Sequence, residues 1–246
     1  MKAAIPDAIF GRMNDAGKSR AADRAIQFVQ NGQVVGLGTG STAAFAIKGL
    51  GRLVREGLRI AGVPTSTRSE QLARKVGIPI VDLNECSRVD ITIDGADQVD
   101  DRFDMIKGGG GALIREKLVA IASDREVIVV DRSKLVSQLG GPVPLPVEVL
   151  PFGWRLASRF LQELGGVPRL RQSGGVPFES DNGNYILDCD FGAIPDAGTL
   201  EKRVRQVPGV VESGLFVGLA DMLIIGSESG VEIRERQTWA VPRESP

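Results

Sequence analysis

Short apolar runs alternate with helix-like segments through the first 135 residues, and this alternation constrains the fold more than any other feature of the sequence. Four runs bounded by glycine and proline are predicted to be buried strands: residues 34–37, 59–63, 89–93 and 127–130. Three segments between or beside them are predicted to be helices: residues 42–54, 69–76 and 112–123. Apolar strands separated by helices are typical of a parallel sheet that is covered on both faces. The sequence therefore predicts an α/β fold.

A proline-rich segment, residues 140–151, ends this alternation and is predicted to be a crossing between domains. Beyond it, residues 154–164 and 200–207 have helical patterns. Strands are predicted around four positions: Val147, Arg169, Ile186 and Val211. Such a set of strands with two helices suits a small α+β unit of the ferredoxin-like kind. The last apolar run, residues 222–225, is predicted to return to the first sheet.

The sequence thus predicts two domains. Residues 1–139 and 216–246 are expected to form the larger α/β domain, and residues 140–215 a smaller lid or oligomerisation domain. The last dozen residues include Pro242 and Pro246 and are expected to be a loose tail.

The composition excludes several classes of protein and partner. The chain has 30 basic and 31 acidic side chains, so nothing electrostatic favours nucleic acid or an anionic membrane surface. No stretch approaches the ~20 apolar residues of a membrane helix, and the N-terminal segment lacks the apolar run of a secretion signal. Cys86 and Cys189 lie far apart, which predicts a reduced, cytoplasmic protein with buried, inert thiols.

The chain contains no histidine, so few side chains are left for proton transfer near neutral pH. A general acid or base has to be a carboxylate, a lysine, a cysteine or the single tyrosine, Tyr185. The usual ligands of a zinc site are also lacking, and nothing in the sequence requires a magnesium ion bound by oxygens.

A glycine-rich turn, GLGTGST at residues 36–42, follows the first predicted strand and opens a predicted helix. Backbone N–H groups at such a helix N-terminus, with the hydroxyls of Thr39, Ser41 and Thr42, suit a phosphate group. The alternative is a plain tight turn in which Ser41 or Thr42 caps the helix. A dinucleotide motif would need glycine in place of Ser41, and the Gly-Lys-Ser/Thr ending of a nucleotide P-loop is lacking.

Two acidic residues, Asp94 and Asp97, enclose the dipeptide Gly95-Ala96 after the strand predicted to end at Ile93. In parallel sheets ligands bind at the carboxyl ends of the strands, so this turn can direct both carboxylates into one pocket. The alternative makes Asp94 a turn-former and Asp97 a helix cap. The spacing alone does not decide between the two.

Lys107 precedes four consecutive glycines, Gly108 to Gly111. Such a run has a large entropic cost, which is expected where the backbone approaches a ligand closely or adopts positive φ; a flexible linker is the alternative. On the next predicted helix, Glu116 lies on a face of small residues. It is either a catalytic carboxylate or a plain residue at the helix edge.

Other charged residues have ordinary interpretations when each is considered alone. Lys18 and Lys134 are predicted to lie on the surface, and Arg115 and Lys117 to be solvated or paired. Glu148 is predicted to point outward from a strand.

Eight motifs occur in order over nearly the whole chain, and together they resemble those of the A-type ribose-5-phosphate isomerase family. The motifs are GLGTGSTA (36–43), GVPTS (62–66), DGAD (94–97), KGGGGALIREK (107–117), DRSK (131–134), PLPVEV (144–149), DNGNYILD (181–188) and PGVVESGLF (208–216). Two differences from the family pattern, Gln98 after DGAD and Arg132 within D-x-S-K, remove no proposed catalytic group.

The resemblance implies interconversion of ribose 5-phosphate and ribulose 5-phosphate in the non-oxidative pentose phosphate pathway, with neither metal nor organic cofactor. It implies a small-molecule sugar phosphate as substrate and a homodimer or a dimer of dimers. It also implies that a Rossmann-like α/β domain carries catalysis beside a smaller α+β domain.

By matching position, the resemblance makes Glu116 the general base. It also implies that Asp94 and Asp97 hydrogen-bond the sugar oxygens, and that Lys107 stabilises the charge that develops in a cis-enediolate. The residues implied to bind substrate are Thr39, Gly40, Ser41, Thr42, Asp94, Gly95, Ala96, Asp97, Lys107, Gly108, Gly109, Gly110 and Lys134, with Lys18 helping at the phosphate.

Two other functions compete with the isomerase. A non-catalytic sugar-phosphate sensor would bind without turnover and normally follows a DNA-reading helix-turn-helix, for which the roughly thirty residues ahead of the first strand are too few. An NAD-linked dehydrogenase is disfavoured by the spacing of the glycines.

Overall fold

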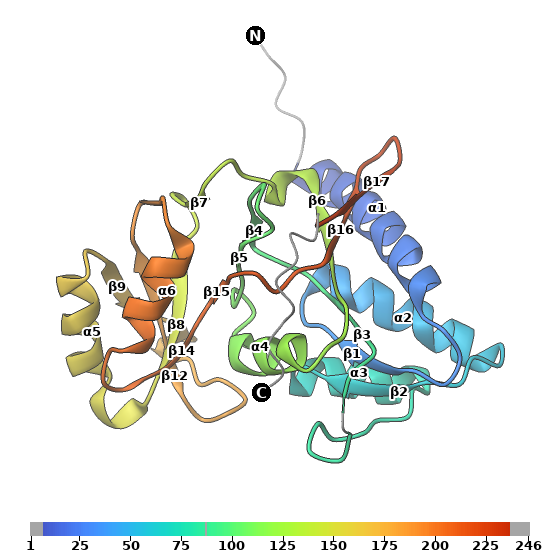
Figure 1. Cartoon of the computed structure of the whole chain (residues 1–246), viewed down its shortest axis with the longest axis horizontal. Helices are drawn as coiled ribbons and strands as arrows, with labels where there is room; N and C mark the ends of the chain where they lie inside the picture. Colours follow the sequence, from blue (N-terminus) through green and yellow to red (C-terminus); the bar gives the residue numbers. More distant parts are fainter. Residues whose placement is uncertain (1–6, 87, 237–246) are drawn as a thin grey trace, which may run out of the picture.

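The computed structural model describes the backbone of residues 7–86 and 88–236 and the side chains from residue 15 onward. Its centre is a six-stranded sheet in the order β17-β16-β6-β3-β1-β2 (Figure 1). The strands are β1 (Val34–Leu37), β2 (Ala61–Pro64), β3 (Ile91–Asp94), β6 (Glu126–Asp131), β16 (Met222–Gly226) and β17 (Val231–Glu235). All pair in parallel except β17, which runs antiparallel to β16 at one edge. The predicted parallel sheet is confirmed, and the last apolar run returns to it as β16.

Helices cover both faces of this sheet. They are α1 (Asp7–Ala25), α2 (Ser41–Arg55), α3 (Thr67–Val76) and α4 (Leu113–Ile121). The first three share a core with one face, and α4 packs on the other. Along β6, Val127 and Val129 belong to the first core, while Ile128 and Val130 belong to the second. Because both faces are buried, the five parallel strands are mainly apolar.

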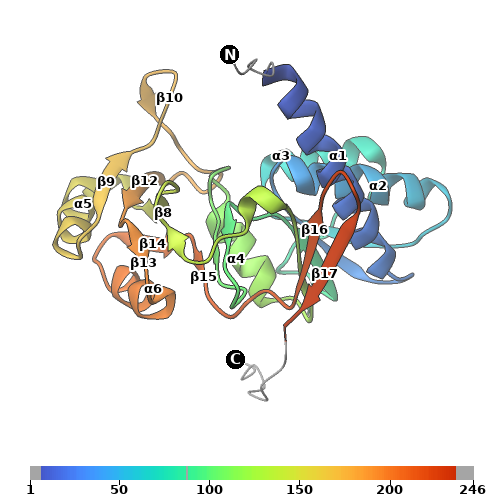
Figure 2. The same ribbon diagram turned by 90° about the horizontal axis from the view of Figure 1, so that it is seen from above.

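A second sheet of four antiparallel strands lies beside the first, in the order β14-β8-β12-β9 (Figures 1 and 2). Its strands and helices are β8 (Leu145–Val149), α5 (Trp154–Glu163), β9 (Val167–Leu170), β12 (Tyr185–Asp190), α6 (Ala197–Arg205) and β14 (Val210–Ser213). The two helices share one apolar core with the sheet, which contains Leu161, Leu187 and Val204. The strands predicted around Val147, Arg169, Ile186 and Val211 are all present.

The proline-rich segment at residues 140–151 does more than connect the two sheets. It contributes β8, an interior strand of the second sheet that is buried along its whole length. Shorter strands join neighbouring segments: β4 (Gln98–Val99), β5 (Met105–Ile106) and β15 (Leu215–Phe216) form one small sheet, β7 (Leu139–Gly140) pairs with β13 (Ala193–Ile194), and β10 (Gln172–Ser173) pairs with β11 (Val176–Pro177). The predicted domain limits at residues 139/140 and 215/216 stay a prediction.

The outward position predicted for Glu148 is wrong. Glu148 lies in β8 and is 0% exposed. Its Oε1 accepts hydrogen bonds from Ser180 Oγ and from Asn184 Nδ2, the latter at 3.1 Å. The carboxylate is buried because β8 is an interior strand and the turn that precedes β12 folds over it.

Lys117 is one of the two charges predicted to be solvated or paired, and it is paired. Its side chain is 5% exposed, and its Nζ lies 2.9 Å from both Glu201 Oε1 and Glu212 Oε1. This buried ion triad connects α4, which covers the first sheet, to α6 and β14 of the second. The two sheets are therefore joined by charge as well as by backbone.

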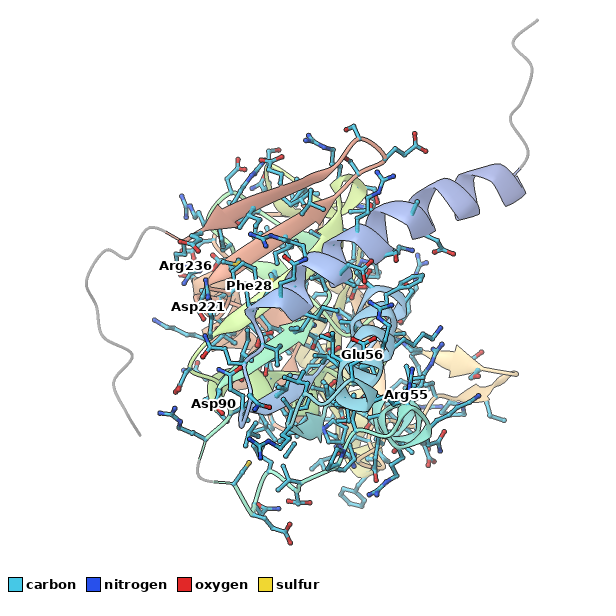
Figure 3. The ribbon with its side chains drawn as sticks, turned by 90° about the vertical axis from the view of Figure 1, so that its right-hand side faces the viewer. Phe28, Arg55, Glu56, Asp90, Asp221 and Arg236 are labelled. Carbon is cyan, nitrogen blue, oxygen red and sulfur yellow. The ribbon has the colours of Figure 1, made fainter. Side chains whose placement is uncertain are left out.

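Carboxylates satisfy the amino ends of two strands of the large sheet. Asp90 Oδ2 accepts a hydrogen bond of 2.7 Å from Val34 N–H, and Asp221 Oδ2 accepts one of 2.7 Å from Glu126 N–H. Asp90 and Asp221 are both labelled in the side view of the molecule (Figure 3). The carboxyl ends of the strands, at the opposite edge, are where ligands bind in sheets of this kind.

Two expectations concern other parts of the chain. The loose tail predicted for the last dozen residues falls largely outside the described residues, which end at 236. Among the described residues, no helix combines the length and the apolar character needed to cross a bilayer.

Gly36→Ala is expected to lower the free energy of unfolding by about 1–3 kcal/mol, as overpacked cores do. An added Cβ would collide with Thr92 Oγ1 and lie 2.7 Å from Val119 Cγ1, because α4 packs directly on β1 there. Urea denaturation measures the change. Gly198→Ala is the control: this helical glycine has ordinary φ and its nearest contacts are at 3.7 Å and 3.8 Å, so stability should stay equal or rise. Equal stability of Gly36→Ala and the wild type would contradict the close packing.

Candidate functional site

One cavity of about 190 Å³ opens at the carboxyl ends of β1, β3 and β6. It brings together nearly all the residues that the sequence analysis proposed for the site: Lys18, Thr39, Gly40, Ser41, Thr42, Gly95, Ala96, Asp97, Lys107, Gly108, Gly109, Gly110, Glu116 and Lys134. Asp94 lies behind the cavity wall, where its side chain is fully buried. Val130 and Ser133 also line the cavity, although the sequence analysis did not propose them.

Lys107 lies at the centre of a buried cluster of charges. Its Nζ is 3.1 Å from Asp94 Oδ2 and 3.4 Å from Glu116 Oε1, and it also donates to the carbonyl of Gly95. None of the three charged side chains is more than 6% exposed. Among the described residues, Oε2 of Glu116 has no hydrogen-bond partner. The Glu116 carboxyl is therefore held through one oxygen, and its other oxygen is buried without such a partner.

The pKa values of this cluster suit proton transfer. Burial raises the pKa of Glu116 to about 8; the Lys107 cation opposes this shift, and Asp94 and Asp97 add to it. For Lys107, burial lowers the pKa, but Asp94 and Glu116 outweigh burial and hold the pKa above its ordinary value. A carboxyl with a pKa near neutrality beside a fixed cation can accept a proton and return it.

Asp94 joins the glycine-rich turn to the end of β3. Its Oδ1 accepts hydrogen bonds from the N–H groups of Thr39, at 3.0 Å, and Gly95, at 2.7 Å. Gly38 lies against this carboxylate with no room for a Cβ atom. Burial raises the pKa of Asp94, against the effect of Lys107 and of these N–H groups. One buried side chain thus positions both the turn and the lysine.

Asp97 is not a helix cap, because the strand β4 follows it directly. Its Oδ2 accepts a hydrogen bond of 2.7 Å from Gly109 N–H, which connects the DGAD turn to the glycine run. Within that run Gly111 N–H donates to the carbonyl of Gly108 at 3.0 Å, and these two residues have φ values of 80° and 103°. Positive φ is readily available only to glycine, so the run is a hydrogen-bonded turn on the cavity wall and not a linker.

The amino end of α2 borders the same cavity. Gly40 precedes the helix at φ 109°, and no side chain caps this end. The alternative in which Ser41 or Thr42 caps the helix is therefore wrong, because both residues already belong to its first turn. The first N–H groups of an uncapped helix are open to an anion.

Two lysines add positive charge to the cavity. Lys18 comes from α1 and is 15% exposed, and Lys134 comes from the short helical turn after β6. Both line the cavity, so neither is a plain surface lysine. The hydroxyl of Thr39 bonds to those of Thr65 and Ser66, at 2.8 Å and 2.7 Å, and so supports the glycine-rich turn from the other side.

Glu126, at the start of β6, is a buried acid that the sequence analysis missed. It is 0% exposed, and neither carboxyl oxygen has a hydrogen-bond partner within the part of the chain that the structure describes. Burial raises its pKa well above the ordinary value, and Asp94 adds to this effect. Burial therefore disfavours the charged form of this carboxyl. The one signal in the sequence is an acid that opens an otherwise apolar run, EVIVV.

The cavity combines two kinds of group. The open amino end of α2, with Lys18 and Lys134, suits a small anion such as phosphate. The buried pair of Glu116 and Lys107 suits proton transfer next to an oxygen that becomes negative. Fold and site together define an α/β enzyme that moves protons on a small phosphorylated substrate.

Comparison with known proteins identifies the family. The family model for ribose 5-phosphate isomerase A (phosphoriboisomerase A) matches residues 61–230. Over 224 residues the chain is 51% identical to the ribose-5-phosphate isomerase A of Thermomicrobium roseum, covering 90% of this chain and 94% of that one. Over 220 residues it is 54% identical to that of Gloeobacter violaceus, covering 89% and 96%. The chain belongs to the ribose 5-phosphate isomerase A family.

Solved structures agree with this assignment. The chain is similar to ribose 5-phosphate isomerase A from Methanocaldococcus jannaschii, with a TM-score of 0.85 and 42% identity over 89% of this chain and 97% of that one. It is also similar to a D-ribose-5-phosphate isomerase in complex with phospho-erythronic acid, with a TM-score of 0.88 and 37% identity over 91% and 99% of the two chains. The resemblance found in the sequence is confirmed, as is the α/β fold class.

Glu116→Gln is expected to stabilise the protein more at pH 8 than near pH 5. The pKa of an ordinary glutamate is 4.5, and that of folded Glu116 is about 8. Between these values the folded state holds a proton that the unfolded state has lost, so stability falls as the pH rises. Glutamine has no such proton. Urea denaturation of both proteins at the two pH values measures the difference; an equal effect at both would contradict the raised pKa.

Proposed function

We propose that this chain interconverts D-ribose 5-phosphate and D-ribulose 5-phosphate, a step of the non-oxidative pentose phosphate pathway, with neither metal nor organic cofactor. Relatives that share about half of its residues carry the name of this isomerase. The observation that carries the proposal is the buried Glu116 carboxyl, which lies 3.4 Å from Lys107 Nζ on the wall of a cavity for a small ligand.

The reaction moves a hydrogen between two carbons. Glu116 takes the proton from C2 of the aldose; the electrons of that C–H bond form the C1–C2 double bond, and those of the C1 carbonyl move to O1. The proton then returns to C1, where the electrons of the double bond form the new C–H bond; the proton of the O2 hydroxyl moves to O1, and O2 becomes the carbonyl oxygen of the ketose. A pKa of about 8 lets Glu116 both accept and return a proton near neutral pH.

Negative charge develops on oxygen in the cis-enediolate between these steps. We assign its stabilisation to Lys107 with the N–H groups of the glycine run. Asp97 lines the cavity and is assigned the transfer of the hydroxyl proton between O1 and O2. For Asp94, contact with a sugar oxygen stays a prediction; its ion pair of 3.1 Å supports a role in holding Lys107 in place.

The substrate phosphate is assigned to the amino end of α2, with Lys18 and Lys134 as additional positive charges. The support is that both lysines and Gly40 to Thr42 line the same cavity as Glu116. Binding of the phosphate, away from the reacting carbons, supplies energy that holds C1 and C2 beside the base.

A protein that only senses sugar phosphates is the competing function. Such a sensor needs a site for the phosphate but no buried carboxyl with a pKa of about 8 beside a buried lysine, an arrangement that costs stability. The isomerase is therefore favoured over the sensor.

We further propose that the chain acts as a homodimer or a dimer of dimers in the cytoplasm. Phe152 is fully exposed, and Leu150 and Leu156, close to it in sequence, are 50% and 46% exposed. Exposed apolar side chains of this size favour contact with another protein surface. Cys86 and Cys189 are both free, as expected in a reducing compartment. Size-exclusion chromatography with light scattering tests the oligomer, and a monomer would contradict it.

The purified chain is expected to convert ribose 5-phosphate into ribulose 5-phosphate in heavy water with EDTA, and to incorporate deuterium on carbon. Glu116→Gln is expected to lower kcat about 10²- to 10⁴-fold, the usual contribution of a general base. Glu163→Gln, on an exposed part of α5, is the matched control and should keep wild-type activity. No turnover by the wild type, or full activity of Glu116→Gln, would sink the proposal.

The value of kcat/KM is expected to rise with pH and to level off above about 8, because Glu116 has to be deprotonated to accept the proton. Lys107→Met should move this inflection to higher pH, since the lysine cation lowers the pKa of Glu116. It should also reduce kcat about 10²- to 10³-fold through loss of the oxyanion stabiliser. Lys48→Met, at an exposed position of α2, is the control. An unchanged inflection in Lys107→Met would contradict the coupling.

A further inference from the structure

Arg171 connects the second sheet to the glycine run, and the mechanism above does not use it. The residue lies between β9 and β10. Its Nη1 donates to two successive carbonyls, that of Gly108 at 2.8 Å and that of Gly109 at 3.2 Å. Both glycines line the cavity that holds Glu116. A side chain next to the second sheet therefore binds the backbone of the proposed active site.

The guanidinium of Arg171 is itself held in place. Asp188 on β12 accepts two hydrogen bonds from it, with Nε to Oδ2 at 2.9 Å and Nη2 to Oδ1 at 2.5 Å. Two parallel bonds fix the plane of a guanidinium as one bond does not. The ring centre of Phe178 lies 5.8 Å from the guanidinium carbon, and the side chain of Arg171 is 15% exposed. With Nε and Nη2 engaged by Asp188, Nη1 is directed at the glycine carbonyls.

Because the peptide bond is planar, holding the two carbonyls also fixes the directions of the N–H groups that follow them. In a trans peptide, the carbonyl of one residue and the N–H of the next point in opposite directions. The held carbonyl of Gly108 thus directs the N–H of Gly109 away from Arg171, and that N–H donates to Asp97 Oδ2 at 2.7 Å. The held carbonyl of Gly109 directs the N–H of Gly110 away in the same manner.

The next backbone donor along the glycine run is the N–H of Gly110. Gly110 lines the cavity, and among the described residues its N–H has no acceptor. A backbone donor that is already oriented and has no protein partner can stabilise an oxygen that becomes negative during a reaction. A run of four glycines has unusual conformational freedom, so such a donor is effective only if something holds the turn.

We propose that Arg171 is a positioning residue for the isomerisation, which orients the Gly110 N–H toward an oxygen of the enediolate by holding the carbonyls of Gly108 and Gly109. The proposal rests on the function proposed above. Asp188 is the second member of the device, because it holds the guanidinium at the required angle.

Two substitutions test the proposal. Arg171→Met removes the hydrogen bonds to Asp188 and to the glycine carbonyls. Arg171→Lys keeps the positive charge but lacks the planar guanidinium that binds Asp188 and the carbonyls at the same time. Both are expected to lower kcat about 10- to 100-fold, less than direct loss of an oxyanion donor, and to change the KM for ribose 5-phosphate less than about threefold. Arg169→Met is the matched control: Arg169 lies on the same chain segment, is exposed, and should behave like the wild type.

Inhibition by phospho-erythronic acid separates positioning from a merely structural role. This ligand of a related isomerase carries a carboxylate where the sugar has its reacting carbon. Its inhibition constant should rise in Arg171→Met by about the factor that kcat falls, since both depend on the same donor. A rise in KM with unchanged kcat would overturn the proposal. A loss of kcat that only follows a loss of thermal stability, with unchanged inhibition, would overturn it too.

The backbone resonance of Gly110 provides a readout that does not depend on turnover. In ¹H–¹⁵N spectra, phospho-erythronic acid should shift the Gly110 signal of the wild type and leave that of Arg171→Met nearly unmoved. An unshifted Gly110 signal in the wild type would overturn the positioning role. If the wild type binds and shifts in this way but does not isomerise ribose 5-phosphate, the proposed function fails while the role of Arg171 in orienting the donor stands.

Discussion

The ion pairs of Lys107 with Asp94 and Glu116 are the interaction on which the rest of the site depends. An ammonium group that is 2% exposed is tolerated inside a protein only when carboxylates compensate for its lost hydration. Each partner brings its own segment: Asp94 holds the glycine-rich turn after β1 to the end of β3, and Glu116 comes from α4. Lys107 therefore joins the end of β3 to α4, and through Asp94 it also supports the glycine-rich turn, which lies far away in sequence.

The same burial that makes this cluster costly makes it reactive. Removing Glu116 from water raises its pKa to about 8, while Lys107 prevents a larger rise and stays charged. The result is a base that works near neutral pH in a chain that has no histidine. The fully buried Glu126 is another acid of the surrounding core, and burial raises its pKa well above the ordinary value. Burial is thus the main cause of the raised pKa values of the acids in and around the site.

Much of the fold and the site could be predicted because the signals are local. The apolar runs predicted as β1, β3 and β6 lie within two residues of the observed strands, since a strand buried on both faces is mainly apolar. The residues around GTGST and DGAD meet in one cavity because both motifs follow strands that end at the same edge of the sheet, and the glycine run joins them through the hydrogen bond from Gly109 N–H to Asp97. The prediction that was wrong concerns the burial of a side chain by residues of other elements. The position of Glu148 depends on Ser180 and Asn184, which lie more than thirty positions further along the chain.

The sequence by itself determined the class of fold, the family and the set of residues that could do the chemistry. Composition and spacing are properties of the chain before it folds, and the absence of histidine limits the bases whatever the fold. Only the tertiary structure decided which candidates act together. Burial and the neighbouring charges set the pKa of Glu116. The fold also placed Asp94 against Lys107, and it brought Arg171 to the carbonyls of Gly108 and Gly109. The contacts of Arg171 join distant segments, and burial depends on the whole fold, so no local pattern encodes these effects.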